Sequence, residues 1–274
     1  MPKVFLVTGS SRGLGRDIAE AVLEAGHRLV ATARKPEQLD DLVAKYGEHI
    51  HPVALDVTDV AASEAAVKAA VETFGRLDVV VNNAGYANFV AVEDISADDF
   101  RAQLDTNLLG VVNVTKAALP VLREQGSGHI IQISSVGGRL ATMGLSAYQA
   151  AKWAVGGFSS VLAQEVAPLS IKVTVLEPGG MDTDWNGSSM AIPPISEPYQ
   201  GTVGVAARYM HPETPVKASD PAKVAQVVLT IADLDEPPLR LLLGTDAVTH
   251  AGNAAKAQEA ADAKWRELSV STDY

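Results

Sequence analysis

Two residues that could carry out acid–base chemistry, Tyr148 and Lys152, stand four positions apart in the 274-residue chain. Four residues are about one helical turn, so a helix would place both side chains on one face. An ammonium near a phenol stabilises the phenolate and lowers the pKa of the tyrosine from about 10 toward neutrality. Such a tyrosine can exchange a proton with a substrate oxygen. The same spacing also occurs on ordinary solvated helix faces, so its meaning depends on the rest of the chain.

Further polar residues stand where they could join this pair. Two adjacent serines, Ser134-Ser135, lie at the end of an apolar, strand-like segment, and the second of them is thirteen residues before Tyr148. Asn107 lies inside the pattern of a long helix, where asparagine is unfavourable by propensity. The ordinary interpretation of Asn107 is a polar residue that faces solvent.

A glycine-rich segment at residues 8–15, Thr-Gly-Ser-Ser-Arg-Gly-Leu-Gly, lies between a strand pattern and an amphipathic helix pattern. Glycines let the backbone approach a pyrophosphate, and a helix N-terminus offers free N–H groups and the positive end of the helix dipole. With a strand before it and a helix after it, the segment predicts a nucleotide-binding loop. The alternative is a tight turn that only needs glycine. The predicted contacts are Gly9, Ser11, Arg12, Gly13, Leu14 and Gly15.

The end of the second predicted strand indicates which nucleotide is bound. An acidic residue there would bind the free ribose hydroxyl of NAD, but this chain has Arg34 after Ala33. A guanidinium is a forked, permanently charged donor suited to a phosphate, and Arg12 can reach the same side. The predicted cofactor is therefore NADP(H). Arg34 could otherwise be an exposed cation that precedes a helix.

The next two strand ends carry residues that suit the rest of a nucleotide. A carboxylate after the third strand can hydrogen-bond an adenine amino group, and small or amide residues after the fourth strand permit close packing. Both segments could also be plain turns, because Asn and Gly favour turns. The predicted contacts are Asp56, Val57, Asn83, Ala84 and Gly85.

Strand-length apolar runs alternate with helical patterns along the chain. Continuous apolar strands between amphipathic helices indicate a parallel sheet covered on both faces, and right-handed crossovers make it a doubly wound α/β sheet. We predict a single domain over residues 1–274. Its seven strands are predicted at residues 4–8, 29–33, 53–55, 77–81, 129–133, 171–176 and 239–243. The main helices are predicted at residues 14–25, 60–74 and 98–122, with one that carries Tyr148 and Lys152 and runs to about Val166, and another that starts at Pro221 and has Asp220 as its N-cap.

Two segments depart from this alternation. Residues 179–220 are rich in Gly, Ser and Pro with interspersed aromatic residues, and so long an insertion is often a functional lid. A disordered surface loop is the alternative. Residues 251–274 are predicted to form a C-terminal helix or a frayed tail. The predicted substrate contacts are Trp185 and Tyr199 in the insertion, with Met143 and Leu145 before the Tyr148 helix, and their apolar character suggests a mainly apolar ketone or alcohol.

Composition excludes several functions. A net charge of −11 and a pI near 5.0 argue against general nucleic-acid binding, which needs a basic surface. The absence of cysteine excludes disulfides, thiolate nucleophiles and zinc–cysteine sites, and it fits a cytoplasmic protein. We expect no targeting segment and no membrane association, because the sequence has no signal-peptide pattern and no apolar stretch of membrane-spanning length. We expect no metal site, because the six histidines are scattered.

Together these motifs resemble the short-chain dehydrogenase/reductase family, in its shorter, single-domain branch. They follow the family's order and spacing from Val4 to about Thr183. The residues that carry the resemblance are the segment 8–15, Asp56, the segment 82–85, Asn107, Ser135, Tyr148, Lys152 and Pro178-Gly179.

The resemblance implies a Rossmann fold and a role for each residue. Tyr148 would be the general acid in reduction and the base in oxidation, and Lys152 would lower its pKa and hold the nicotinamide ribose. Ser135 would polarise the substrate carbonyl, and it is preferred to Ser134 because the family's usual separation of this serine from the tyrosine is thirteen residues. Asn107 would anchor a water in a proton relay that runs through Lys152. The residues expected to flank the nicotinamide are Pro178, Gly179 and Thr183.

The resulting expectation is an NADP(H)-dependent carbonyl reductase or alcohol dehydrogenase. Family resemblance also implies a homodimer or homotetramer formed through the long helices, including the helix of Tyr148. One alternative is a non-catalytic NADP-binding regulator, whose signature would be a broken catalytic set. Another is a sugar-nucleotide epimerase, whose glycine loop is spaced differently and whose C-terminal substrate region is larger.

Overall fold

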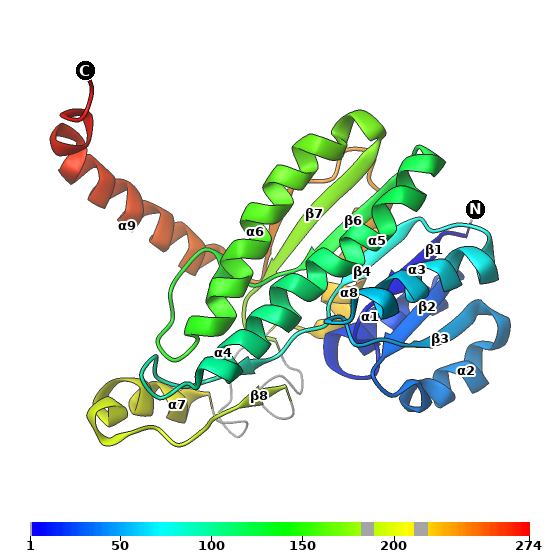
Figure 1. Ribbon diagram of the computed structural model, residues 1–274, viewed down its shortest axis with the longest axis horizontal. Helices are drawn as coiled ribbons and strands as arrows, with labels where there is room; N and C mark the ends of the chain where they lie inside the picture. The colour runs from blue at the N-terminus through cyan, green and yellow to red at the C-terminus, as the bar shows by residue number, and fades with distance from the viewer. Residues whose placement is uncertain (1, 182–188, 211–218) are drawn as a thin grey trace.

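Residues 2–181, 189–210 and 219–274 are described by the computed structural model (Figure 1). Seven strands form one sheet in the order β3-β2-β1-β4-β6-β7-β9, and every neighbouring pair is parallel. This confirms the prediction of a doubly wound α/β sheet of the Rossmann type. The strands are β1 (Val4–Val7), β2 (Arg28–Ala33), β3 (Ile50–Ala54), β4 (Val79–Asn82), β6 (Gly128–Ile133), β7 (Ile171–Pro178) and β9 (Arg240–Leu243).

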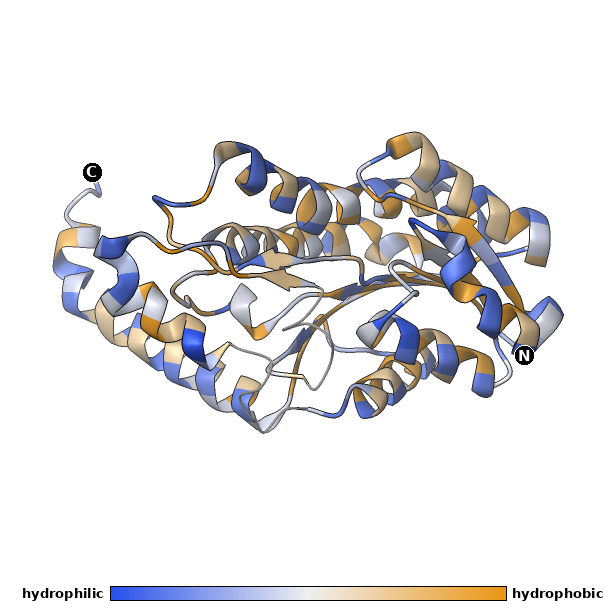
Figure 2. Cartoon of the chain, turned by 90° about the horizontal axis from the view of Figure 1, so that it is seen from below, coloured by the Kyte–Doolittle hydropathy of each residue, from blue (hydrophilic) through white to orange (hydrophobic). Residues whose placement is uncertain are grey.

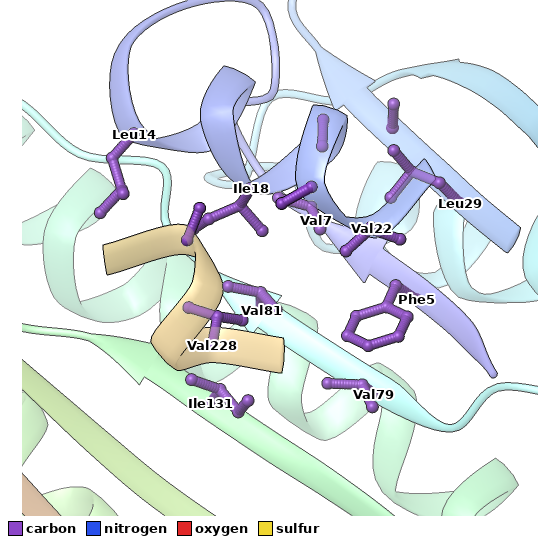
Figure 3. Packing of buried hydrophobic residues seen from close by; sticks show 14 of the residues in the cluster. Phe5, Val7, Leu14, Ile18, Val22, Leu29, Val79, Val81, Ile131 and Val228 are labelled. Carbon is purple, nitrogen blue, oxygen red and sulfur yellow. The ribbon is translucent and has the colours of Figure 1, made fainter. Parts of the chain in front are cut away.

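Helices cover both faces of the sheet. One face carries α1 (Gly13–Glu24), α2 (Asp40–Tyr46) and α8 (Pro221–Asp233), and the other carries α3 (Val60–Phe74), α5 (Gly110–Gln125) and α6 (Ser146–Val166). Alternate side chains of a strand point to opposite faces. Phe5 and Val7 therefore pack with the first layer, in the same cluster as Ile18 and Val22 (Figure 3), whereas Val4 and Leu6 pack with the second. Figure 2 shows the strands between the two layers largely in hydrophobic colours.

The strand order reverses beside β1. The chain passes from β1 outward to β2 and β3, and then returns to β4 on the other side of β1. Open parallel sheets bind their ligands in the crevice at the carboxyl ends of the strands, next to such a switch point. The loops after β1 and β4 thus occupy the position that this fold provides for a nucleotide.

The long helix predicted at residues 98–122 is interrupted. It consists of α4 (Ala97–Leu104), one π-helical turn at Asp105–Leu109, and α5. A π-helical turn inserts one extra residue into a helix and frequently lies at a functional site. Hydrophobic periodicity could not predict this turn, because its central residue, Asn107, is polar and fully buried.

Part of the insertion predicted at residues 179–220 contains regular structure. β8 (Met190–Ala191) pairs in parallel with β5 (Ala87–Asn88), which follows β4 in the chain. Two-residue strands are too short to have a recognisable period, so the sequence did not predict them. Through this pairing the insertion is attached to the loop that leaves β4.

The remaining elements lie in the C-terminal part and in short turns. The side chain of Asp220 accepts a hydrogen bond from the Ala222 N–H at 2.9 Å, which confirms it as the N-cap of α8. α9 (Thr245–Val270) is longer than the helix or tail predicted from Ala251.

None of the helices in the described residues is long and apolar enough to cross a membrane. The insertion also holds a π-helical turn (Gln200–Gly204) and α7 (Val205–Tyr209), and 3-10 turns lie at Pro36–Leu39, Gly47–His49, Val136–Gly138, Ala167–Leu169 and Glu197–Tyr199.

A buried ion triad ties the end of β7 to two neighbouring segments. Glu177 is fully buried in β7. Arg139 Nε donates to its Oε2 at 2.7 Å, and Arg240 Nε donates to its Oε1 at 3.0 Å. Arg139 follows the loop that begins at Ser135, and Arg240 opens β9. One carboxylate therefore joins three segments near the carboxyl edge of the sheet.

We predict that Glu177→Gln lowers the free energy of unfolding by about 3 kcal/mol, because it leaves two guanidinium groups without their buried counter-ion. The matched control is Asp41→Asn, which breaks the ion pair between Arg16 and the exposed Asp41. An exposed pair contributes far less to stability, because water already solvates both charges. Urea unfolding measures both changes. If the two variants lose the same free energy of unfolding, the buried Glu177 does not stabilise the fold more than an exposed ion pair does.

Candidate active site

Ser135, Tyr148 and Lys152 come together where α6 passes the end of β6. Tyr148 and Lys152 lie in the first two turns of α6, and Ser135 lies two residues after β6. The side chain of Ser135 hydrogen-bonds to that of Tyr148. Ser134 instead directs its hydroxyl to the Lys152 carbonyl oxygen at 3.4 Å. The hydroxyl placed beside the phenol is therefore that of Ser135.

The ammonium of Lys152 is buried between α6 and β6. Its Nζ donates to the carbonyl oxygen of Ile133, the last residue of β6, at 2.8 Å. The same Nζ lies 5.6 Å from the centroid of the Tyr148 ring. The ammonium thus stands over the ring face while its hydrogen bond goes to the strand.

The pKa values of this pair differ from the sequence-based expectation. Burial raises the pKa of Tyr148 to about 12, although its hydrogen bond with Ser135 acts in the opposite direction. Burial also lowers the pKa of Lys152 to about 8. Removal from water disfavours the charged form of each group, and for the phenol this effect exceeds that of the Ser135 hydrogen bond. The pKa of Tyr148 is therefore raised, whereas the sequence analysis expected the nearby ammonium to lower it.

Asn107 fixes the loop that leaves β4. Its Oδ1 accepts from the Tyr86 N–H at 3.1 Å, and its Nδ2 donates to the carbonyl oxygens of Tyr86 and Gln103, each at 2.9 Å. The solvent-facing interpretation of Asn107 is wrong, because the residue is fully buried. A buried amide must satisfy its polar atoms, and these bonds do so across two segments of the chain.

The glycine loop after β1 makes a close backbone contact that excludes side chains. Gly9 has φ +69°, in the left-handed region that favours glycine. A Cβ added to Gly15 would lie 2.2 Å from the Gly9 carbonyl oxygen and 2.4 Å from Asn83 Nδ2. The first turn of α1 can therefore pack against the loop only with glycine at position 15.

The loops after β1 and β4 are joined by Thr8. Its Oγ1 accepts from the N–H groups of Asn83 at 2.9 Å and Ala84 at 3.0 Å. The Asn83 side chain returns a hydrogen bond to the Thr8 carbonyl oxygen at 2.9 Å. The sequence analysis included Thr8 in the glycine motif but did not predict this role.

The N-terminus of α1 fits a phosphate group. Its N-cap residue is Arg12, and no described side chain caps this end of the helix. The first turn also contains no acidic residue among those described. Uncapped N–H groups and the positive end of the helix dipole attract an anion. The predicted contacts Ser11, Gly13 and Leu14 lie in this turn or directly before it.

The residues predicted to bind the adenosine end lie at neighbouring strand ends. Arg34 is exposed directly after β2, and Arg12 is exposed in the loop of the adjacent strand β1. Asp56 is exposed after β3, and its Oδ1 accepts from the Thr58 N–H at 3.0 Å and hydroxyl at 2.8 Å. Val57 is buried. The two guanidiniums therefore stand at the carboxyl edge of neighbouring strands, as a 2′-phosphate would require.

The segment after β7 is held by α9. Asp246 Oδ2 accepts from the Gly180 N–H at 2.8 Å. A Cβ on Gly179 would lie 2.2 Å from the same oxygen, so the carboxylate occupies the space of a side chain there. The sequence contains no local signal for this contact, because 66 residues separate Gly180 from Asp246. Pro178 ends β7 beside this contact, and Thr183 lies outside the described residues.

An apolar cluster covers Tyr148 on the side of the insertion. It joins Phe89, from the segment after β4, to Met190 and Val203 of the insertion. Of the predicted substrate contacts, Leu145 and Tyr199 are half-buried against this cluster. Tyr148 is therefore covered by apolar side chains that the insertion supplies.

Three further predictions concern residues at the margin of this region. Met143 is 58% exposed, and Trp185 lies outside the described residues. The hydroxyl of Tyr199 donates to Glu93 Oε2 at 2.7 Å, so its polar end points away from an apolar ligand. Within the described part of the chain, no group of three or more His, Asp or Glu could hold a metal ion.

Comparison with known proteins identifies close relatives of this arrangement. The family model described as short chain dehydrogenase matches residues 3–191. A protein named oxidoreductase BOA17 from Botryotinia fuckeliana is 60% identical over 99% of this chain and 100% of its own length. The crystal structure of a short-chain dehydrogenase from Streptomyces avermitilis has a TM-score of 0.93 and 39% identity, with 100% of both chains covered. An alcohol dehydrogenase from Thermococcus sibiricus, solved with 5-hydroxy-NADP, has a TM-score of 0.73 and 28% identity over 89% of this chain and 96% of its own.

We predict that Lys152→Met changes how stability depends on pH in the nucleotide-free protein. The Lys152 pKa is about 8 in the fold, against an ordinary value of 10.5. Between these values the unfolded wild type holds a proton that the folded wild type has lost, so folding gains stability as pH rises. As pH rises, the free energy of unfolding of the wild type should therefore increase relative to that of Lys152→Met, by at most about 1.4 kcal/mol per pH unit.

Urea unfolding from about pH 7 to about pH 10 measures this difference. Lys116→Met, at an exposed position on α5, is the control and should follow the wild type at every pH. A constant difference between the wild type and Lys152→Met would show that the pKa of the buried ammonium is not lowered.

Proposed function

Because the chain belongs to the short-chain dehydrogenase/reductase family, we propose that it is an NADP(H)-dependent oxidoreductase that interconverts a carbonyl and an alcohol. The observation that supports this most strongly is the meeting of Ser135, Tyr148 and Lys152 at the end of β6. The glycine loop lies at the same edge of the sheet, because parallel strands end on the same side. A proton donor and a nucleotide site therefore share one crevice.

The proposed reaction needs a hydride and a proton. When bound, NADPH supplies the hydride. Tyr148, with its pKa near 12, is protonated at neutral pH and donates its proton to the carbonyl oxygen. Ser135, which is hydrogen-bonded to that phenol, orients and polarises the same oxygen. Lys152 stabilises the negative charge that develops on Tyr148, because its Nζ stands 5.6 Å from the ring centroid.

The proton lost by Tyr148 must be replaced. We propose the route implied by the family resemblance, in which Asn107 anchors a water that passes a proton through Lys152. The π-helical turn around Asn107 supports this role, because such turns frequently lie at functional sites. The Asn107 side chain also holds Tyr86 beside the cofactor loop, so its removal would disturb binding as well as proton supply.

Three observations support NADP(H) as the cofactor. Arg34 stands after β2, where an NAD-binding protein would carry a carboxylate. The N-terminus of α1 is free of capping side chains among the described residues. The 28% identical Thermococcus sibiricus alcohol dehydrogenase was solved with an NADP derivative. Pro178, Gly179 and Thr183 are proposed to flank the nicotinamide.

The proposed substrate is mainly apolar. The cover over Tyr148 is built from Phe89, Met190 and Val203, with Leu145 and Tyr199 packed beside them. A buried apolar surface beside the proton donor favours a ketone or alcohol with apolar substituents over a charged one. We propose that residues 179–220 act as the lid of this pocket, with Trp185 and Met143 as further contacts.

The main alternative is a non-catalytic regulator that binds NADP(H) on the same fold. Such a protein would need the loop after β1 but not the buried Lys152, whose desolvation costs stability. The retention of Lys152 beside Tyr148 favours the enzyme. We also propose a cytoplasmic homo-oligomer in which the face of α5 and α6 forms a contact, because Trp153 and Val161 are exposed there.

We predict that Tyr148→Phe lowers kcat at least about 100-fold, because general acid catalysis of this kind contributes that much or more. Binding of NADPH should change less than about twofold, since the ring remains in place. NADPH oxidation against a panel of aliphatic and aromatic ketones measures turnover, and fluorescence titration measures binding. Tyr46→Phe on the far helix α2 is the control, and full turnover by Tyr148→Phe would reject the proton-transfer assignment.

We predict that Arg34→Asp reverses or abolishes the preference for NADPH over NADH. Loss of a charge-assisted bond to phosphate costs about 1.5–3 kcal/mol, which is a change of about 10- to 100-fold in the ratio of dissociation constants. Arg123→Asp, at an exposed position in the last turn of α5, is the matched control. If the ratio is the same in both variants and the wild type, Arg34 does not read the 2′-phosphate.

A further inference from the structure

The first turn of α5 contacts the segment that follows β3. Asn113 Nδ2 donates to the carbonyl oxygen of Val57 at 3.0 Å and lies 3.5 Å from that of Thr58. Asn113 and Val57 are 56 residues apart in the chain, so this bond joins the helix to a distant loop. We call residues 55–58 the adenine segment, because Asp56 and Val57 are the contacts predicted for the adenine of the cofactor.

A glycine makes a second contact between the same helix and the same segment. Gly110 and Asn113 lie three residues apart, so both face the same side of α5. A Cβ added to Gly110 would lie 2.4 Å from Val57 Cγ2, and Val57 is itself buried. Gly110 therefore lets the helix lie directly against the side chain of Val57, while Asn113 binds the carbonyl of the same residue.

The direction of the Asp56 carboxylate depends on the shape of the adenine segment. Its Oδ1 accepts from the Thr58 N–H at 3.0 Å and from the Thr58 hydroxyl at 2.8 Å. The carboxylate is thus oriented by the residue two positions further on. Asn113 holds Val57, which lies between these two residues, so the bond from α5 fixes the place of the whole turn.

The same stretch of helix holds the other end of the proposed cofactor site. Asn107, in the π-helical turn directly before α5, binds Tyr86 in the loop after β4. In the sheet, β2 and β1 lie between β3 and β4. Residues 107–113 therefore hold the loops of two strands that are not neighbours, and one continuous piece of helix sets the separation of these loops.

We propose that Asn113 is a positioning residue for the adenine end of the cofactor site, and that Gly110 permits its approach. This inference rests on the proposed binding of NADP(H). Asp56 accepts a hydrogen bond from the adenine amino group, and Asn113 places that carboxylate before the cofactor arrives. A loop that is already ordered does not reduce the affinity through the cost of ordering it. Asn113 acts through the adenine segment and need not touch the cofactor.

The test changes the donor and compares two cofactors. Asn113→Asp keeps the shape of the side chain but turns a carboxylate toward the Val57 carbonyl oxygen. The probes are NADPH and its hypoxanthine analogue, which lacks the adenine amino group. Fluorescence titration measures both dissociation constants, and NADPH oxidation with a ketone measures kcat and KM.

The wild type should bind NADPH more tightly than the analogue, because only NADPH offers the amino group to Asp56. Asn113→Asp should raise the dissociation constant of NADPH about fivefold or more, the factor that corresponds to one lost hydrogen bond. The dissociation constant of the analogue should rise less, so the ratio of the two constants approaches one. In turnover, KM for NADPH should rise by a larger factor than kcat falls.

Two further variants complete the experiment. Asn253→Asp, at an exposed position on α9, adds the same charge and should bind both cofactors as the wild type does. Asn113→Ala removes the donor without adding a charge and should change both dissociation constants in the same direction as Asn113→Asp. Circular dichroism shows whether each variant is folded, and Asn113→Ala decides the result if Asn113→Asp does not fold.

Four results would overturn the proposal. One is an unchanged affinity for NADPH in the Asn113 variants, and another is an equal loss for both cofactors, which indicates general damage to the fold. Failure of both Asn113 variants to fold would show that Asn113 supports the whole domain instead. A wild type that binds both cofactors equally would show that the adenine segment does not read the amino group. In that case wild-type turnover with NADPH still decides the proposed function separately.

Discussion

The hydrogen bond from the buried Lys152 ammonium to the Ile133 carbonyl is the contact on which the site depends. An ammonium is costly to remove from water, so a buried one must find a fixed acceptor. The end of β6 supplies that acceptor and thereby fixes how α6 lies along the strand. Tyr148 stands one turn before Lys152, and Ser135 stands two residues beyond Ile133. A single polar bond consequently brings the phenol and the serine hydroxyl together.

Polar contacts of the same kind hold the loops around this centre. Asn107 holds the loop after β4, Glu177 joins β7 to the segment after Ser135, and Asp246 holds the residues after β7. Each is a side chain that binds backbone or charged groups from a distant part of the chain. Loops at the end of a sheet have little apolar surface to bury, so hydrogen bonds and ion pairs define their positions. Because Asp246 lies in the first turn of α9, the start of this helix holds the proposed nicotinamide segment.

The sequence predicted the elements that have local signals and missed those that depend on distant partners. Seven strands, the glycine loop and the N-cap at Asp220 each have a pattern within a few residues, and the structure confirms these elements. The π-helical turn at Asn107, the β5–β8 pair and the contact of Asp246 with Gly180 arise between segments far apart in the chain. The direction of the Tyr148 pKa was predicted wrongly for a related reason. Spacing showed the nearby cation, whereas burial is set by the whole fold and includes Phe89 and Met190.

The pKa shifts of Tyr148 and Lys152 determine which protonation state this pair has at neutral pH. At neutral pH a phenol with a pKa near 12 holds its proton, and an ammonium with a pKa near 8 is mostly charged. In the proposed reaction, this phenol gives its proton to the substrate oxygen, and the cation is already in place to stabilise the phenolate that results. Proton abstraction from an alcohol would first require that phenolate to form against the desolvation that raises its pKa. At neutral pH the buried pair is therefore held as a neutral phenol beside a charged ammonium, which is the form that the proposed reduction needs.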